Sequence, residues 1–262
     1  MNPLLAILYG IVEGVTEYLP VSSTGHLILL AALLHREAGS FEIVIQFGAI
    51  LAVVVHYRAL LLERLRGLVR GEKKARALLL ALVVGFLPLA VLGFAVGKKV
   101  KNALFHPVPV AIALIVGGIV MIVVERVRKL DSGPATSIDD VTPRRALIVG
   151  IGQCFALFPG ASRSMCTIVA GRLAGLSRKT AAEFSFLLGI PTLGAATAYS
   201  ALKEHKELHD VGVLNVAIGM IVSFFVAWGV VAVFLRYLEK RGLEPFGAYR
   251  ILLGIVVLLA LR

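Results

Sequence analysis

Long runs of apolar residues, separated by short basic segments, make up most of the chain. A helix needs about 20 mainly apolar residues to cross a bilayer, and six runs reach or approach that length. They are 41–57, 76–97, 107–125, 181–201, 213–236 and 247–262. The apolar residues are continuous rather than alternating, as they would be in the strands of a membrane β-barrel. The pattern predicts an all-α polytopic membrane protein with six transmembrane helices.

Two further apolar stretches, 4–34 and 146–171, are each interrupted by proline and small polar residues. The first break, at 20–25, reads PVSSTG, and the second break, at 159–164, reads PGASRS. Proline ends a helix, whereas serine and threonine are good N-caps for a new one. Each stretch is therefore expected to form two half-helices, a re-entrant pair. Irregular backbone at membrane depth is tolerated only where protein or a water-filled cavity supplies hydrogen-bond partners to its N–H and C=O groups. Both breaks are therefore expected to line a site.

The net charge of +11 is unusual for a chain with a mean hydropathy of +0.90. Eighteen of the 27 Lys and Arg residues lie in four segments between apolar runs, at 57–76, 126–145, 172–180 and 236–246. This distribution is typical of cytoplasmic loops under the positive-inside rule. The sequence lacks the basic stripe with interleaved aromatic residues that nucleic-acid binding uses. The charge therefore predicts membrane orientation, with no nucleic acid as a partner.

The two broken stretches are expected to form an inverted internal repeat. If each turns back to the side from which it entered, the first opens outward and the second, three spans later, opens inward. The matching residues are Glu13, Pro20, Ser22 and Thr24 against Gln153, Pro159, Ser162 and Ser164, and then Glu42 and Gly48 against Glu183 and Gly189. A single membrane domain, 1–262, would hold repeats at about 1–130 and about 140–262. A bundle of eight crossing helices is the alternative.

Few ionisable side chains lie inside the apolar stretches, and their cost there makes them candidates for function. They are Glu13, Glu17, His26, Glu42, Arg163 and Glu183. Arg163 is thus the one basic residue expected deep in a membrane segment. Glu13 and Glu17 share one face of a helix, and two neighbouring carboxylates repel unless a cation or proton separates them. They are the predicted metal site, for Mg²⁺ or Ca²⁺, unless they are interfacial glutamates that reach water.

Each break also supplies a helix N-terminus, whose free N–H groups and positive dipole end favour an anion. Arg163 adds a planar fork of donors suited to phosphate. The expected substrate-binding residues are Ser22, Thr24, Gly25, Gln46, Ser162 and Ser164. Facing a carboxylate pair, these groups predict a site for a phosphate or, more specifically, a diphosphate.

Ser23 is the predicted nucleophile, and His26, three residues later, is its predicted base. Alternatively, His26 or Glu17 activates a water molecule directly. Glu42 and Glu183, at the starts of their spans, either support the site or cap helices at the interface. The predicted catalytic residues are Glu17, Ser23, His26 and Arg163.

The run from Glu13 to Leu27, EGVTEYLPVSSTGHL, resembles the signature of the bacterial undecaprenyl-diphosphate phosphatases, the bacitracin-resistance family. The second break resembles the second motif of that family, and the likeness continues through Gln46–Ala52 and covers the whole chain. After the second motif the family usually has glycine and a small residue, where this chain has Met165 and Cys166. Losing that glycine is expected to tighten the half-helix beside Arg163.

The resemblance implies a multi-pass enzyme of the bacterial cytoplasmic (inner) membrane that removes the terminal phosphate of undecaprenyl diphosphate, which regenerates the carrier lipid for peptidoglycan. It also implies a divalent cation, an inverted-repeat fold and an active site open to the outer, periplasmic face. The main alternative is a transporter or flippase of an anionic prenyl-phosphate lipid, because half-helices in inverted repeats also bind anions without chemistry. The small pair Gly117-Gly118 suits packing within or between subunits, which leaves a homodimer open.

Overall fold

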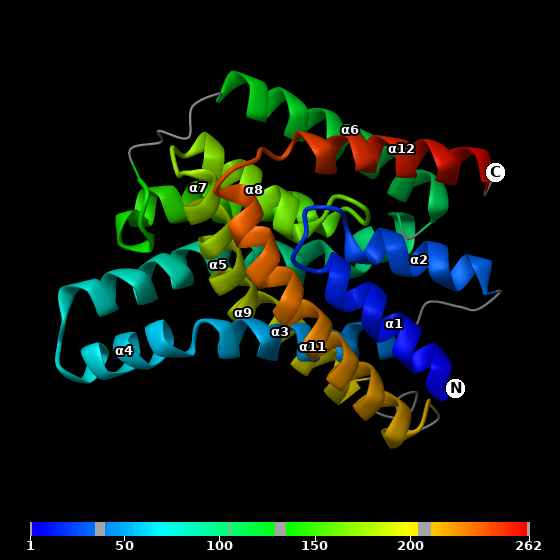
Figure 1. Cartoon of the computed structure of the whole chain (residues 1–262), viewed down its shortest axis with the longest axis horizontal. Coiled ribbons are helices and arrows are strands. Elements are labelled where there is room, and N and C mark those ends of the chain that lie inside the picture. The colour runs from blue at the N-terminus through cyan, green and yellow to red at the C-terminus, as the bar shows by residue number, and fades with distance from the viewer. Residues whose placement is uncertain (1, 35–39, 105, 129–134, 204–210, 261–262) are drawn as a thin grey trace.

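The computed structural model describes residues 2–34, 40–104, 106–128, 135–203 and 211–260, and this part of the chain is helical, without a β-strand (Figure 1). Its helices are α1 (Pro3–Thr16), α2 (Ser23–Leu33), α3 (Ser40–His56), α4 (Arg58–Val69), α5 (Lys73–Leu104), α6 (Pro107–Val127), α7 (Pro143–Gln153), α8 (Arg163–Leu173), α9 (Arg178–Lys203), α11 (Val213–Leu238) and α12 (Glu244–Ala260). Two 3₁₀ turns, η1 (Ile138–Asp140) and η2 (Cys154–Leu157), flank α7. The predicted all-α class is confirmed.

Four helices, α5, α6, α9 and α11, are each long and apolar enough to cross a membrane. The other two predicted spans correspond to α3 and α12, which have 17 residues each. α3 meets α4 at a bend of 72°, and together they form a fifth candidate span. The first basic segment, expected as a loop, therefore contains a helix. A multi-pass membrane protein is confirmed, with four to five candidate spans.

Both broken stretches form pairs of short helices. The first break separates α1 from α2, and the second separates α7 and η2 from α8. α2, α7 and α8 have 11 residues each. At about 1.5 Å per residue each is about 16 Å long, half of a hydrocarbon core of about 30 Å. Figure 1 shows α2 running back beside α1 from the turn.

Helices from the first half of the chain pack against helices from the second half. α1 lies on α11 and α7 lies on α5, while α6 pairs with α12 and α3 with α9. Glycines allow the close approach, because a Cβ at Gly150 would lie 2.5 Å from the carbonyl oxygen of Gly85. A Cβ at Gly118 would likewise lie 2.5 Å from the carbonyl oxygen of Gly247. The Gly117-Gly118 pair therefore serves packing within the chain.

Gly48 makes the tightest of these contacts, since a Cβ there would lie 2.1 Å from the carbonyl oxygen of Met220 on α11. We expect Gly48→Ala to push α3 from α11 and to destabilise the protein by about 2 kcal/mol, a fall in Tm of roughly 4–8 °C in detergent. Gly229→Ala is the matched control, because a Cβ there meets nothing within 4 Å and alanine favours the helix. Equal Tm values for the two variants would contradict this packing.

The described parts of the four basic segments meet on one face of the molecule, which we name the basic face (57–76, 126–128, 135–145, 172–180 and 236–246, with their flanking residues). The ion pairs between them are Arg64–Asp139 (2.6 Å), Lys74–Asp139 (3.1 Å), Arg126–Glu244 (3.2 Å), Lys179–Glu239 (2.6 Å) and Arg178–Glu125. The buried Arg172 adds a hydrogen bond of 2.8 Å to the carbonyl oxygen of Arg128. Segments predicted to share one side of the membrane thus lie together in the fold.

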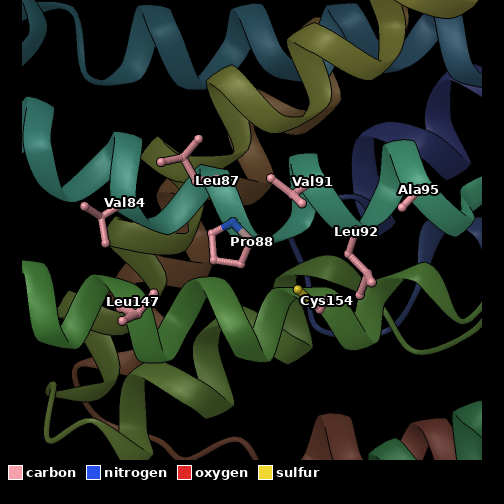
Figure 2. A pocket seen from close by; sticks show the side chains of 8 residues that line it. All are labelled: Val84, Leu87, Pro88, Val91, Leu92, Ala95, Leu147 and Cys154. Atoms are coloured by element: carbon pink, nitrogen blue, oxygen red, sulfur yellow. The ribbon is translucent and has the colours of Figure 1, made fainter.

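An open groove of about 570 Å³ lies between α5 and α7 (Figure 2). Six of its residues follow α5 from Val84 to Ala95, and Leu147 and Cys154 line the other side. Apart from the Cys154 thiol, the lining side chains are apolar and offer no partner to a charged group. The polar site therefore lies elsewhere.

Candidate active site

Two serines shape the breaks. Ser22 and Ser162 cap α2 and α8, and their hydroxyls accept hydrogen bonds from the N–H groups of Gly25 and Met165, each at 3.2 Å. In the described chain they are the only non-glycine residues with positive φ, at 74° and 72°. Such strained backbone is frequent at functional sites. A Cβ at Gly25 would lie an ordinary 3.4 Å from the Ser22 hydroxyl, so the folded chain itself does not require glycine there.

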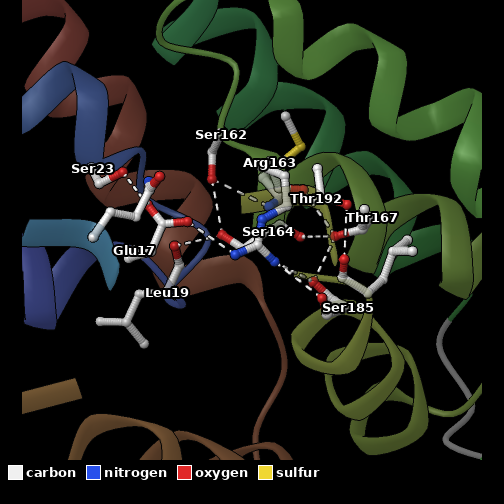
Figure 3. A network of polar contacts seen from close by, with 12 residues as sticks. Glu17, Leu19, Ser23, Ser162, Arg163, Ser164, Thr167, Ser185 and Thr192 are labelled. Carbon is white, nitrogen blue, oxygen red and sulfur yellow. Dashed lines mark hydrogen bonds and ion pairs between the residues drawn. The ribbon is translucent and has the colours of Figure 1, made fainter. Parts of the chain in front are cut away.

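The buried carboxylate of Glu17 contacts Ser23 and Arg163 in the polar network of Figure 3. Its Oε1 accepts a hydrogen bond from Arg163 Nη2 at 2.9 Å. Its Oε2 accepts from the Ser23 hydroxyl at 2.6 Å and from Gln46 Nε2 at 3.0 Å. Four predicted site residues from α1, α2, α3 and α8 therefore meet at one carboxylate.

The Arg163 guanidinium is fixed from three sides. Its Nη1 donates to the carbonyl oxygen of Ser185 on α9 at 3.0 Å, and its Cζ lies 5.2 Å from the centre of the Tyr18 ring. A Cβ at Gly189 would lie 3.0 Å from Nη1, so glycine leaves the guanidinium its space. The sequence interpretation missed Ser185 and Tyr18. Gly189 was predicted only as the repeat partner of Gly48. In the structure, α9 places Gly189 beside the Arg163 guanidinium.

The second break also contacts the first directly. The Ser164 hydroxyl donates to the carbonyl oxygen of Leu19 at 2.8 Å and lies 3.0 Å from the Ser162 hydroxyl. Thr24 is half-buried in the first turn of α2. Residues 146 positions apart, Glu17 and Arg163, are thereby held in a single site.

His26 does not pair with Ser23 in this structure. Its Nδ1 lies 2.7 Å from the carbonyl oxygen of Ser22, and its Nε2 lies 2.6 Å from the hydroxyl of Tyr249 on α12. The His26 and Tyr249 rings are stacked, with centroids 5.6 Å apart. The physical reason is that Ser23 finds a stronger, charged acceptor in Glu17. The expected Ser23–His26 pair is thus replaced by a Ser23–Glu17 pair.

Glu13 lies one turn before Glu17 and is 1 % exposed. Its Oε1, like Oε1 of Glu42, is buried without a hydrogen-bond partner, and Glu17 and Glu42 both act on Glu13 electrostatically. Among the described residues, no three His, Cys, Asp or Glu side chains form a ready metal cluster. Mg²⁺ often needs only one or two carboxylates, with substrate phosphates and water completing its shell. The free oxygen of Glu13 beside Glu17 fits such a cation.

Arg250 corrects the expectation that Arg163 is the one basic residue deep in a membrane segment. It lies on α12, in the predicted span 247–262, and is fully buried. Its guanidinium donates hydrogen bonds to backbone carbonyls of both breaks. Glu183, by contrast, interacts electrostatically with Lys179 and Glu239 at the basic face.

The departure from the family motif leaves a regular helix. α8 begins at Arg163, and Met165 is buried with its methyl group against Gly117, where a Cβ would lie 2.9 Å from it. Cys166 is also buried. The Met165 side chain thus fills space between α8 and α6, and the Ser162 N-cap is kept.

Comparison with known proteins agrees with the motif resemblance. Residues 6–256 match the family model "Bacitracin resistance protein BacA". An undecaprenyl-diphosphatase of Sorangium cellulosum is 55% identical over 260 residues, 97% of this chain and 84% of that protein. Proteins of the same name from Neisseria meningitidis serogroup C and Thermoanaerobacter pseudethanolicus are 43% and 46% identical, over 98% and 97% of this chain and 94% and 95% of their own lengths. The chain therefore belongs to the BacA family of bacitracin resistance proteins.

Proposed function

We propose that this protein hydrolyses undecaprenyl diphosphate to undecaprenyl phosphate and inorganic phosphate. The observation that carries the proposal is the contact of a serine hydroxyl and an arginine fork with one buried carboxylate, Glu17. The product is the carrier lipid for peptidoglycan, and its regeneration accounts for bacitracin resistance. The names of the relatives favour hydrolysis over lipid transport.

The first chemical step is attack by Ser23 on the terminal phosphorus. The Ser23 hydroxyl proton passes to Glu17 Oε2, which lies 2.6 Å away, as the bond from Oγ to phosphorus forms. The bond between that phosphorus and the bridging oxygen breaks, and undecaprenyl phosphate leaves with the proton from Glu17. Arg163 stabilises the charge on the transferring phosphoryl group together with the N–H groups that begin α2 and α8.

The second step releases inorganic phosphate. Glu17 takes a proton from water, the water oxygen bonds to phosphorus, and the bond from phosphorus to Ser23 Oγ breaks as Oγ recovers the proton. Direct attack by water activated by Glu17 is the alternative route, and a rapid-quench search for phosphoserine distinguishes the two. In the resting enzyme Arg163 neutralises Glu17, so binding of a diphosphate to Arg163 releases the carboxylate to act as a base.

Glu13 and Glu17 are the proposed ligands of a divalent cation, Mg²⁺ or Ca²⁺. When bound, such a cation neutralises charge on the diphosphate. We expect chelation to stop phosphate release, and we expect Glu13→Gln to raise the cation concentration for half-maximal activity by at least about tenfold. The control is Glu63→Gln, which alters a mainly exposed carboxylate on α4. Identical cation titrations of both variants would contradict the assignment.

We further propose six transmembrane helices and two re-entrant pairs, related as inverted repeats at about 1–130 and about 140–262. The packing of α1 on α11 and of α7 on α5, each pair joining the two halves of the chain, supports this arrangement. The positive-inside rule favours an inner-membrane orientation with the basic face in the cytoplasm and the site open to the periplasm. Labelling of Arg70→Cys in intact cells by an impermeant reagent would contradict that orientation.

The direct test of the function is phosphate release from undecaprenyl diphosphate by the purified full-length protein in detergent with Mg²⁺ or Ca²⁺. Steady release that stops when the substrate is exhausted is the expected result. Binding of the lipid without release of phosphate would refute hydrolysis and favour transport.

A further inference from the structure

Arg250 joins the two breaks through their backbones. Its Nη1 donates to the carbonyl oxygen of Pro20 in the first break at 3.2 Å. Its Nη2 donates to the carbonyl oxygens of Gly160 and Ala161 in the second break at 2.9 and 3.0 Å, and to that of Ala113 on α6 at 3.2 Å. One side chain therefore holds four carbonyl groups from three separate segments.

The surroundings of Arg250 differ from those of an ordinary buried ion pair. The residue has 0 % exposure, and no carboxylate in the described part of the chain lies within ion-pair distance. Burying a charge is costly, and here backbone carbonyl dipoles help to compensate it. The carbonyls of Pro20, Gly160 and Ala161 in turn belong to irregular backbone, which has no helical donors and needs partners at membrane depth. An arginine, with five N–H donors in a fixed plane, can serve several such carbonyls at once.

The fold reserves space for this guanidinium. A Cβ at Gly117 on α6 would lie 2.4 Å from Arg250 Nη2. Gly160 has φ of +89°, and a Cβ there would lie 2.5 Å from the carbonyl oxygen of Val110. The carbonyl group of Gly160 itself can therefore face Arg250 only because this residue is glycine. The contact is thus built by α6, α12 and the second break together.

The bonded carbonyls stand directly before the reacting side chains. Pro20 precedes Ser23 by three residues, and Ala161 precedes Arg163 by two. The residue beside Arg250, Tyr249, holds His26 through its hydroxyl, and His26 bonds the carbonyl oxygen of Ser22. α12 therefore supports both breaks next to the site without supplying a group to it.

We propose that Arg250 is a positioning residue that keeps the two breaks in the conformation in which Ser23 and Arg163 meet at Glu17. The proposal rests on the proposed hydrolysis and extends it to a residue that touches only backbone. Loss of the Arg250 guanidinium is expected to displace Ser23 and Arg163 from Glu17. A displacement of about 1 Å lowers the rate of a catalysed step by about a hundredfold.

The test compares Arg250→Lys with Arg172→Lys in the full-length protein. Arg172 is the matched control, because it is buried, is 2 % exposed and also donates to carbonyl oxygens, but at the basic face. We expect Arg250→Lys to lower kcat by about a hundredfold while KM changes little, and Arg172→Lys to leave kcat near the wild-type value. A wild-type kcat for Arg250→Lys, or an equal loss in both variants, would overturn the proposal.

Hydrogen exchange gives a readout that does not depend on activity. In the protein without substrate, amides at 21–26 and 160–166 are expected to exchange faster in Arg250→Lys, with the other helices unchanged. Unaltered exchange at both breaks would overturn the positioning role. If the wild-type protein released no phosphate, the proposed function would fail, yet the exchange result would still decide whether Arg250 holds the breaks.

A second variant covers the case in which Arg250→Lys does not fold. Gly117→Ala leaves the guanidinium in the chain but displaces it, because the new Cβ would lie 2.4 Å from Nη2. We expect the same pattern, a lower kcat and faster exchange confined to the breaks. Normal kcat and exchange in a folded Gly117→Ala protein would contradict the proposal.

Discussion

Replacement of Ser23 by alanine is expected to lower the rate of phosphate release from undecaprenyl diphosphate by at least about a thousandfold. The Ser23 hydroxyl is the group that donates to Glu17 at 2.6 Å, and alanine removes both the nucleophile and its proton. The neighbouring arginine and helix N-termini would still bind the diphosphate, so KM should change far less than kcat. The measurement is steady-state phosphate release by purified protein at several substrate concentrations.

Ser223→Ala is the matched control for this variant. Ser223 is also a fully buried serine in a helix, but its hydroxyl has no hydrogen-bond partner in the structure. Its removal should leave kcat unchanged and should not lower Tm. Near-normal turnover by Ser23→Ala, with both variants folded, would exclude the phosphoserine route and favour water activated by Glu17.

Substitution of Arg163 by lysine is expected to lower kcat/KM by about a hundredfold, although the charge is kept. The two ends of the guanidinium fork face different partners, with Nη2 on Glu17 and Nη1 on Ser185. A lysine ammonium is a single point charge and cannot hold both positions while it also contacts a phosphate. We expect a higher KM together with a lower kcat, because the fork orients both the resting carboxylate and the transferring phosphoryl group.

The control for this substitution is Arg126→Lys at the basic face. Arg126 forms an exposed ion pair with Glu244, in which the arginine side chain is 70% exposed, and such pairs contribute little. Its conversion to lysine should leave kcat/KM within about twofold of the wild-type value. If Arg163→Lys were as active as this control, Arg163 would serve only to balance the charge of Glu17.

The sequence predicted those features of the fold that depend on neighbouring residues. Mean apolarity over about 20 residues identifies a span, and the proline and serine of each break end one helix and cap the next. Ser22 and Ser162 do cap α2 and α8. The length and bending of individual helices could not be predicted as well from the sequence. α3 ends at His56, and α4 continues from it at a bend of 72° through a segment whose composition indicated only a basic loop.

Partners that are distant in the sequence could not be predicted in the same way. The spacing of Ser23 and His26 suggested a pair, but the nearest charged acceptor for Ser23 comes from α1. Ser185 reaches Arg163 only because α9 packs against α8. Arg250 had a visible signal, a basic residue within an apolar run, but its partners lie 89 to 230 positions away and depend on the tertiary fold.

The basic face has a consequence for the way in which substrate and product move. Alternating access requires a protein to separate its elements on each side of the membrane in turn. On the basic face that separation would break the ion pair of Glu125 with Arg178 and the hydrogen bond from Arg172 to the carbonyl oxygen of Arg128. Removing one partner from a buried charged pair is strongly unfavourable. This side is therefore expected to stay closed through the catalytic cycle, so that the lipid diphosphate enters and the lipid monophosphate leaves on the opposite side of the protein.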